Sequence, residues 1–283
     1  MYNTIKKYIP ASLRSLLKPL YQKWSLRNFT APEIVVVRDD SAQFAIALDR
    51  QNGAVDEYIF IHRNWEPQVG RVLHEHLAAG GVFVDVGANI GYFSLLAAAI
   101  VSESGKVVAF EPLPQLVKQI RRSAAENNYH WLQVIPKALG DTPGAMQLSV
   151  AVGNIGGSSL AAPERAGARL EVEVSTLDTE LADLERIDVM KIDVEGFEYE
   201  MLLGAQAVLT RCRPVLVLEF SPSFYDKRSE SMGREILLSL IHLGYTCTIL
   251  QTKTTSSDVD ELLQLIAGNQ VDLLCTIAEE EKE

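Results

Sequence analysis

The sequence predicts an α/β fold in which a doubly wound, mostly parallel sheet carries helices on both faces. Two patterns predict it. From about residue 66, short apolar runs alternate with segments whose apolar residues recur at the period of a helix. In addition, Asp85 ends the first apolar run, and a turn that contains Gly87 and Gly91 follows it. Strands that alternate with helices pair in parallel, because each crossover helix returns the chain to the same end of the sheet.

The length and composition agree with a folded protein of this class. The chain has 283 residues, of which 47% are hydrophobic and 22% are charged, so a substantial core can form. We expect residues 66–283 to form the main domain and residues 1–65 to form an N-terminal extension. The formal net charge of -11 disfavours general binding to nucleic-acid phosphates, so we expect no nucleic-acid partner.

The first 30 residues of the extension are basic and amphipathic. They contain six Lys and Arg residues and no Asp or Glu. The apolar residues that recur at the spacing of one helix face are Ile9, Leu13, Leu16, Leu20 and Trp24. Such a stretch forms either a helix on an anionic membrane surface or a leader helix that packs on the domain. Pro10 and Pro19 interrupt the pattern.

Three features of the sequence bear on the cellular compartment of the protein. No apolar run is long enough to span a bilayer, and the N-terminal stretch lacks the apolar core and cleavage site of a secretory signal. The three cysteines are far apart in the sequence and odd in number, so no disulfide framework follows from their spacing. We therefore expect a reduced, cytoplasmic setting, with peripheral contact to the inner face of the membrane if residues 1–30 bind lipid.

The elements follow in order along the chain. A hairpin is expected over 33–48, because two strand-like runs flank the turn residues Asp39, Asp40 and Ser41. A helix over 67–79 ends at a pair of glycines. The core strands are expected at 82–86, 106–110, 132–138, 189–194, 214–220, 245–250 and 271–277. The helices between them are expected at 91–101, 114–127, 199–210 and 235–243.

One insertion interrupts this alternation. Residues 145–152 and 169–174 are strand-like and enclose the glycine-rich stretch 153–159. We interpret the insertion as a β-hairpin with a glycine-rich tip. Such a tip forms either a lid over a site or a plain flexible loop.

The turn after the first core strand indicates a cofactor site. In an open α/β sheet, ligands bind in the crevice beyond the carboxyl ends of the strands. Gly87 and Gly91 form a Gly-x-x-x-Gly turn, whereas dinucleotide binding prefers Gly-x-Gly-x-x-Gly. The carboxylate of Asp85 would repel a pyrophosphate, and it suits a ligand with an ammonium and a sulfonium. S-adenosylmethionine carries both groups.

A second carboxylate supports this interpretation. Glu111 ends the second strand and is followed by Pro112, and a carboxylate at this place accepts hydrogen bonds from ribose hydroxyls. Backbone groups or Asp141 at the end of the third strand are candidates to meet the adenine. The alternative is that these carboxylates only cap nearby helices. The predicted cofactor contacts are Asp85, Gly87, Asn89, Gly91, Tyr92, Glu111, Pro112, Ala138 and Asp141.

The motifs of residues 80–220 resemble those of the FkbM family of methyltransferases. The resemblance rests on the runs Val84–Ser94, Phe110–Pro112, Ala138–Asp141, Ser175–Asp178, Lys191–Gly196 and Arg213–Glu219. It implies a class I methyltransferase fold, which is Rossmann-like, and transfer of a methyl group, usually to a hydroxyl oxygen. Members of the family often act on sugars, polysaccharide precursors or complex natural products.

The acceptor chemistry is expected around Lys191, Asp193 and Glu195. If they lie on one strand, these three residues share a face. Asp193 or Glu195 then serves as the general base, with Lys191 orienting them. The alternative is a Lys–carboxylate network that holds the inserted hairpin. Two carboxylates are too few to define a metal site, so no metal is predicted.

Three further residues are candidate acceptor contacts. Glu219 ends the next core strand, Ser221 follows it, and His62 lies in the N-terminal extension. Glu219 could equally cap a helix, and a lone His is more often structural.

The leading hypothesis is an S-adenosylmethionine-dependent enzyme that methylates a hydroxyl of a sugar, a glycan precursor or a natural product. The alternatives are a nucleotide-dependent oxidoreductase of related architecture and a non-catalytic binding protein with the same fold.

Overall fold

The computed structural model describes residues 29, 33–151, 157–161, 167–225, 228–229 and 231–277. The predicted basic helix, part of the glycine-rich tip and the acidic C-terminal tail lie outside the described residues. Within the described part of the chain, no helix combines the length and apolar character that crossing a membrane requires.

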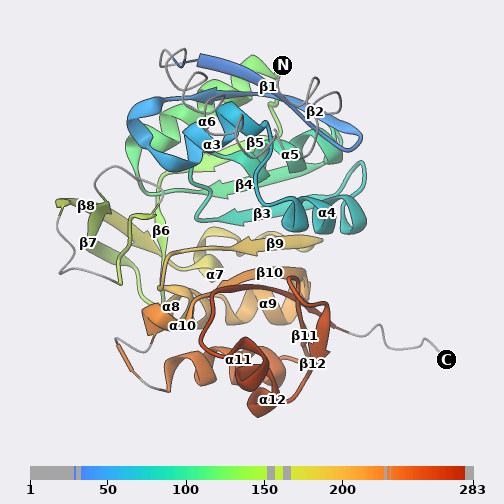
Figure 1. The fold of residues 1–283 in the computed structure, drawn as a ribbon, viewed down its shortest axis with the longest axis vertical. Helices are drawn as coiled ribbons and strands as arrows, with labels where there is room; N and C mark the ends of the chain where they lie inside the picture. The colour runs from blue at the N-terminus through green and yellow to red at the C-terminus, as the bar shows by residue number, and fades with distance from the viewer. Residues whose placement is uncertain are drawn as a thin grey trace, which may run out of the picture.

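The predicted central sheet is confirmed (Figure 1). It has eight strands in the order β12-β11-β13-β10-β9-β3-β4-β5, and β10, β9, β3, β4 and β5 are parallel. The remaining three strands pair antiparallel at one edge. The strands are β3 (Val82–Val86), β4 (Lys106–Phe110), β5 (Leu132–Ile135), β9 (Val189–Ile192), β10 (Val215–Phe220), β11 (Thr246–Ile249), β12 (Thr254–Ser256) and β13 (Val271–Thr276).

The strand order reverses between β3 and β9. From β3 the chain moves outward to β4 and β5, and it then returns to place β9 on the other side of β3. The carboxyl ends of β3, β4 and β9 all point toward a small second sheet (Figure 1). The place where the order reverses is where open α/β sheets bind their ligands.

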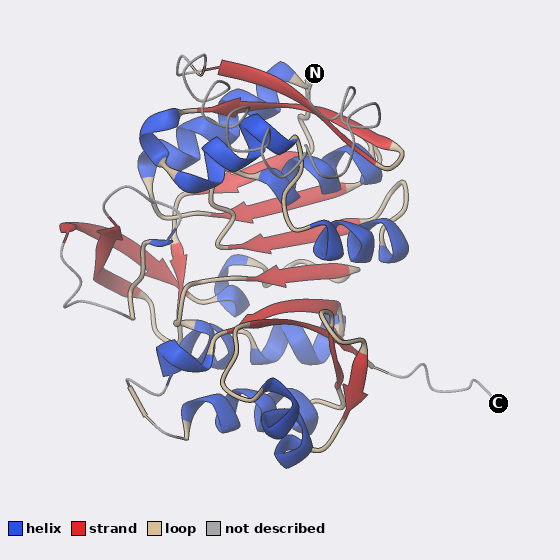
Figure 2. Cartoon of the chain, in the orientation of Figure 1, coloured by secondary structure: helices blue, strands red, loops and turns tan. Residues whose placement is uncertain are grey.

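Helices cover both faces of the sheet (Figure 2). The side chains of each strand alternate between two hydrophobic clusters, so that Phe83 packs in one and Val84 in the other. The first cluster includes α4 (Pro67–His76), α5 (Tyr92–Val101) and α6 (Pro114–Glu126). The second includes α7 (Leu177–Glu180), α8 (Glu198–Leu203), α9 (Gln206–Cys212), α10 (Pro222–Tyr225), α11 (Met232–His242) and α12 (Val259–Ile266).

The predicted N-terminal hairpin is confirmed as β1 (Glu33–Asp39) and β2 (Ala42–Leu48). Its buried residues share the first hydrophobic cluster with α5 and α6. The side chain of Asn127 bonds both backbone groups of Ala45, and the hydroxyl of Ser123 accepts from the amide of Ala47 at 2.9 Å. The hairpin therefore forms an outer layer over these helices.

The prediction for the rest of the extension was incomplete. A short 3-10 helix, η2 (Arg50–Asn52), and a helix, α3 (Ala54–His62), follow the hairpin, where no helix was expected. Apolar residues are spread around α3, so its sequence lacks a clear helical period.

The predicted insertion is confirmed as an antiparallel pair, β7 (Gly144–Ala151) and β8 (Gly167–Ser175). A short strand, β6 (Ala138–Leu139), runs parallel to β8 and completes a three-stranded sheet. This small sheet stands beside the carboxyl ends of the core strands (Figure 1).

Several predicted boundaries were wrong. The helix expected over 67–79 ends at His76, and the helix expected over 235–243 begins at Met232. The strand expected over 132–138 ends at Ile135, because Pro136 has no amide hydrogen to continue the ladder, and the chain turns into β6. The strand expected over 189–194 ends at Ile192. The helix expected over 199–210 is two helices, which separate at Gly204, where the chain passes so close to Gly140 that a Cβ atom would lie 2.0 Å from its carbonyl oxygen.

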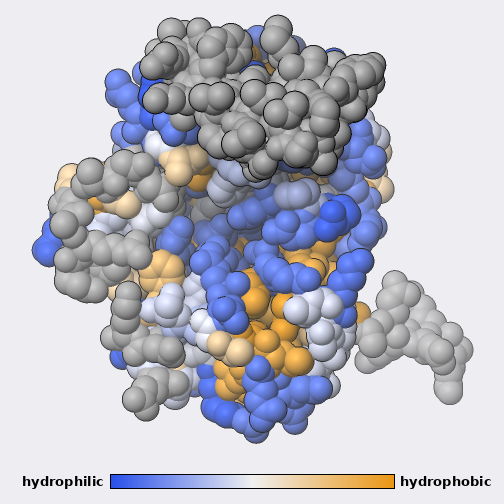
Figure 3. Space-filling model, in the orientation of Figure 1, coloured by the Kyte–Doolittle hydropathy of each residue, from blue (hydrophilic) through white to orange (hydrophobic). Residues whose placement is uncertain are grey.

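The surface is uneven in polarity. On the face shown in Figure 3, hydrophobic residues gather in the lower half, over the C-terminal elements. Only four large hydrophobic side chains among the described residues are classed as exposed, and they are Val36, Tyr58, Leu203 and Leu265.

Candidate active site

A cavity of about 350 Å³ opens where the strand order reverses. Its size is that of a small-molecule site. The ends of β3, β4, β9 and β10 supply its floor, and the N-terminal segment and the small sheet supply its walls. The polar and charged lining residues are Glu66, Asn89, Glu111, Lys137, Ser158, Asp193, Glu195, Glu219 and Gln270.

The turn after β3 is held in one conformation by its neighbours. Gly87 has φ 81°, and a Cβ atom there would lie 1.8 Å from the carbonyl oxygen of Asp193. The amides of Gly87 and Ala88 both donate to the carbonyl of Phe110 at 3.0 Å. Gly87 therefore lets the backbone segments after β3 and β9 approach each other at the edge of the cavity.

Glu111 fixes the next loop and faces the cavity. One carboxylate oxygen accepts from the amide of Asn89 and the other from the amide of Leu113, both at 2.9 Å. Burial raises the pKa of Glu111 to about 8, although these two backbone hydrogen bonds oppose the shift. Each carboxylate oxygen has a second lone pair, so Glu111 can still accept from two hydroxyls.

Asn89 adds an acceptor without a partner. Its backbone is left-handed, with φ 53°, and its side-chain oxygen is buried with no hydrogen-bond partner among the described residues. A buried polar atom without a partner costs free energy, so its occurrence at a cavity indicates a place for a ligand donor.

A buried ionic layer lies beneath the cavity. Asp85 is 1% exposed and accepts from the hydroxyl of Ser94 at 2.5 Å, and burial raises its pKa. Lys191 is 5% exposed, and its ammonium lies 2.7 Å from a carboxylate oxygen of Asp193 and 5.3 Å from the ring centroid of Phe93. Both side chains lie below the ligand space, and the ion pair with Lys191 holds Asp193 in place.

The charge of Lys191 is retained in spite of its burial. Burial alone lowers the pKa of Lys191, but the carboxylates of Asp193, Asp85 and Glu66 outweigh it and raise that pKa above its ordinary value.

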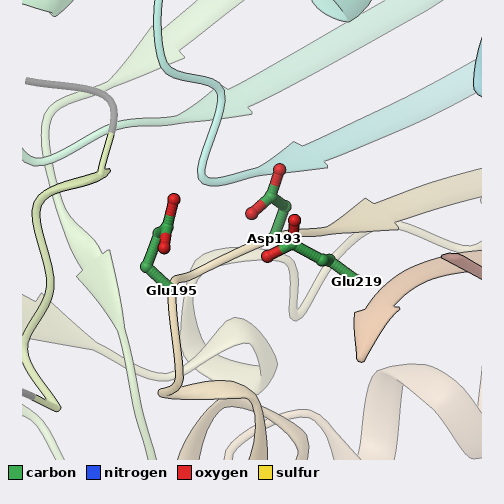
Figure 4. A group of neighbouring side chains, drawn as sticks. All are labelled: Asp193, Glu195 and Glu219. Carbon is green, nitrogen blue, oxygen red and sulfur yellow. The ribbon is translucent and has the colours of Figure 1, made fainter. Parts of the chain in front are cut away.

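Three carboxylates meet at the open side of this layer (Figure 4). Asp193 and Glu219 extend toward each other from the ends of neighbouring strands, and Glu195 stands across from them on the loop after β9. One oxygen from each residue lies within 4.8 Å of the other two. Burial, followed by repulsion from Asp193 and Glu195, raises the pKa of Glu219 well above its ordinary value. We call Asp193, Glu195 and Glu219 the carboxylate cluster.

The loop after β9 brings the cluster together in a way that strand alternation did not predict. Because β9 ends at Ile192, Asp193 and Glu195 are on a turn, and Glu195 has φ 53°. One carboxylate oxygen of Glu198 accepts from the amides of Val194 and Gly196, at 3.1 Å and 3.2 Å, and so fixes this turn.

Most of the predicted site residues line the cavity. Those that do are Gly87, Asn89, Glu111, Pro112, Ala138, Asp193, Glu195 and Glu219. Asp85 and Lys191 lie beneath it, and Gly91 packs against Ile120, where a Cβ atom would lie 2.9 Å from that side chain.

Four further predicted contacts also lie outside the cavity lining. The hydroxyl of Tyr92 donates to Asp39 of the hairpin at 3.0 Å, so its ring points away from the ligand space. Asp141 is exposed, because the chain turns outward after β6. The ring of His62 packs at a tilt of 40° against that of Tyr58, with ring centroids 4.3 Å apart. Ser221 is buried, and its amide donates to the hydroxyl of Tyr225 at 3.2 Å.

Sequence reasoning missed the walls of the cavity. Trp65 and Glu66 reach it from the N-terminal segment, and Leu148 and Leu160 reach it from the insertion. Burial raises the pKa of Glu66 to about 7, and its backbone is left-handed with φ 37°. Only the position of Glu66 directly before Pro67 at a helix start marked it in the sequence.

The sequence model of one protein family, the Methyltransferase FkbM domain, matches residues 85–247, which are more than half of the chain. The chain belongs to the FkbM methyltransferase family. Its sheet order agrees with the class I methyltransferase fold, and S-adenosylmethionine is the cofactor that the family match supports. Between the two enzyme classes that the sequence left open, the family match supports methyl transfer over oxidoreduction.

Two curated relatives are fungal methyltransferases. Methyltransferase sdnD of Sordaria araneosa is 30% identical over 191 residues, which make up 56% of this chain and 73% of the relative. Methyltransferase 1 of Beauveria bassiana (strain ARSEF 2860) is 27% identical over 142 residues, which make up 43% of this chain and 57% of the relative.

Two solved structures are similar at low identity. The crystal structure of methyltransferase FkbM from Methylobacillus flagellatus KT aligns with a TM-score of 0.45 and 13% identity, over 93% of this chain and 60% of that chain. Aeropyrum pernix fibrillarin, in complex with natively bound S-adenosyl-L-methionine, aligns with a TM-score of 0.44 and 10% identity, over 87% of this chain and all of that chain. This chain thus spans less than two thirds of the FkbM structure.

Proposed function

We propose that this FkbM methyltransferase transfers the methyl group of S-adenosylmethionine to a hydroxyl oxygen of a small molecule, such as a sugar, a glycan precursor or a natural product. The observation that supports this most is a single cavity with Glu111 in one part of its lining and the carboxylate cluster in another. The first part fits a nucleoside, and the second fits the activation of a hydroxyl.

The residues of the cavity fit the cofactor. Glu111 can accept from both ribose hydroxyls, and the unpartnered side-chain oxygen of Asn89 can accept a further donor. Pro112, Ala138 and Leu139 form an apolar wall for the adenine. When bound, S-adenosylmethionine supplies an electrophilic methyl group on its sulfonium.

Asp193 is our candidate for the general base. Lys191 binds one of its carboxylate oxygens at 2.7 Å and so fixes the side chain, which lines the cavity. The second oxygen can take the proton of an acceptor hydroxyl as the oxygen attacks the methyl group. Glu195, on the same turn, is the alternative base. Transfer requires that the cavity align the acceptor oxygen with the methyl group and keep water away from it.

The test is transfer of labelled methyl groups to a metabolite extract of the native organism, with Asp193→Asn and Glu195→Gln beside the wild type. We expect Asp193→Asn to lower transfer at least about 100-fold, because general-base catalysis contributes that much. The Kd for S-adenosylhomocysteine, measured by calorimetry, should change less than about threefold, a difference well under 1 kcal/mol.

Two controls decide the assignment. The exposed Glu103 lies outside the cavity, so Glu103→Gln should transfer as the wild type does. Full activity in Asp193→Asn with loss in Glu195→Gln would move the base to Glu195. Tight cofactor binding without transfer to any acceptor would instead indicate a binding protein.

A further inference from the structure

Acidic side chains outnumber basic ones in the lining of the cavity. Five carboxylates line it, and they are Glu66, Glu111, Asp193, Glu195 and Glu219. Among the described residues, Lys137 is the one Lys or Arg in the lining, and its ammonium is bound at 2.9 Å by both Glu173 and Glu180. No basic side chain of the described lining is therefore available to bind a phosphate or carboxylate group of an acceptor.

The cofactor does not balance this charge. Beneath the cavity, the charge of Lys191 is opposed by the carboxylate of Asp85 and by that of Asp193 itself. S-adenosylmethionine adds one net positive charge, from two cationic groups and one carboxylate. Repulsion from Asp193 and Glu195 helps to raise the pKa of Glu219, and a positively charged group beside the three carboxylates would relieve this repulsion, so the acceptor part of the cavity favours such a group.

The carboxylate cluster has the geometry to bind an ammonium. Oxygens that lie within 4.8 Å of one another leave between them a position about 2.8 Å from each, which is the length of a charge-assisted hydrogen bond. An ammonium has three N–H donors, one for each carboxylate. Gln270 donates to one oxygen of Glu219, and the other oxygen of Glu219 is buried with no hydrogen-bond partner among the described residues.

The position of Lys191 favours an ammonium over a divalent metal ion. The Lys191 ammonium already lies 2.7 Å from Asp193, so a second cation bound to this carboxylate would be only about 5 Å from it. Lys191 already occupies one oxygen of Asp193, and the three cluster oxygens match the three N–H donors of an ammonium, whereas Mg²⁺ takes six oxygen ligands. Trp65 adds an aromatic ring to the wall of the same cavity, and aromatic rings attract ammonium groups.

We propose that the acceptor carries an amino group close to the hydroxyl that is methylated, and that the carboxylate cluster binds this group as an ammonium. The proposal rests on the proposed function, because it places the acceptor next to Asp193. It selects amino sugars and amino alcohols and rejects phosphorylated or carboxylated acceptors. The cluster thus determines specificity, and the hydroxyl oxygen remains the atom that is methylated.

The experiment separates labelled products by charge. The enzyme is incubated with labelled S-adenosylmethionine and a metabolite extract of the native organism, and the labelled products are passed over cation and anion exchangers at pH 7. We expect the main product to bind the cation exchanger, to lose that binding after N-acetylation, and to carry its label on oxygen. A neutral or anionic product, or a label on nitrogen, overturns the proposal, whereas the absence of any labelled product contradicts the proposed function itself.

Variants and metal titration complete the test. With the identified acceptor, Glu219→Gln should raise KM at least about tenfold and change kcat less, because a charged hydrogen bond to the ground state is lost. Glu103→Gln, outside the cavity, is the matched control. Titration of the S-adenosylhomocysteine complex with MgCl2 and MnCl2 should show no micromolar site. A micromolar site that Glu219→Gln removes would assign the cluster to a metal ion and overturn the proposal.

Discussion

Gly87 lies where the chain leaves β3 and passes the end of β9. No side chain fits there, because a Cβ atom would lie 1.8 Å from the carbonyl oxygen of Asp193. Its φ of 81° is also one that other residues rarely adopt. The residue thus sets both the shape of the cofactor loop and the position of the proposed base.

Replacing this glycine should damage both stability and cofactor binding. For Gly87→Ala we expect the free energy of unfolding to fall by about 2–5 kcal/mol, since a backbone clash adds to left-handed strain. Affinity for S-adenosylhomocysteine should fall at least tenfold. Gly144→Ala is the control, because nothing lies within 4 Å of its Cβ position. Urea unfolding and calorimetry measure the two effects, and equal behaviour of the two variants would refute the role of Gly87.

Single residues were predictable where the motif gave them a fixed place. Glu111 and Asp193 follow buried strands, so the sequence alone located them at the cavity. The direction of a side chain was harder to predict. Asp85 turns down toward Ser94, and Tyr92 turns to Asp39 of the hairpin, which is far away in the sequence. Hydrogen-bond partners of this kind depend on how distant segments pack together, so no local sequence pattern predicts them.

At the scale of elements, the hairpin and α3 are tied to the domain by a buried polar network. Asp56 on α3 is 1% exposed and accepts from the amide of Asp49 at 2.6 Å and from the side chain of Gln119 on α6 at 2.8 Å. Gln119 also donates to the carbonyl of Ala47 at 2.7 Å. These bonds connect the hairpin, α3 and α6, and of these α3 and α6 contribute residues to the lining of the cavity.

The network should make stability depend on pH. Burial raises the pKa of Asp56 from 3.8 to about 6, so the folded state holds the proton more tightly than the unfolded state. The free energy of unfolding therefore falls as pH rises from about 4 to about 6, by on the order of 3 kcal/mol from this group. Asp56→Asn keeps the acceptor oxygen and should remove this slope.

Urea unfolding at pH 4, 5 and 6 checks the effect of Asp56. The exposed Asp183 has no part in the network, and Asp183→Asn should keep the slope of the wild type. An unchanged slope in Asp56→Asn would show that the residue is already ionised in the folded protein at low pH.

The elements with a clear period were predicted well, and those that depend on context were not. The strands β3 and β4 have the predicted bounds, because each is a short apolar run between turn signals. In contrast, α12 was not predicted, although Asp258 caps it by accepting from the amide of Glu261. The edge strand β12 is only three residues long, too short for any alternation to show.

On the scale of the whole molecule, the protein concentrates buried acids around its cavity. Burial raises the pKa of Glu66 to about 7, of Glu111 to about 8 and of Glu198 to about 7. The folded state therefore loses stability relative to the unfolded state as these groups ionise. The positive cofactor reverses part of this loss, because it favours the ionised form.

This balance predicts how cofactor binding changes with pH. Between pH 5 and pH 8 the Tm of the protein without cofactor should fall. All three groups have raised pKa values, so the folded state gives up its more tightly bound protons over this range and becomes less stable. The increase in Tm caused by S-adenosylmethionine should grow over the same range. Thermal unfolding with and without cofactor measures both, and a smaller shift at pH 8 than at pH 5 would contradict the account.

The measurement that tests the central claim most directly is a crystal structure with S-adenosylhomocysteine. The account predicts the ligand in the cavity at the reversal of strand order, with both ribose hydroxyls bonded to Glu111 and the sulfur facing Asp193, Glu195 and Glu219. A ligand bound elsewhere, or one whose sulfur lies away from these three carboxylates, would contradict it.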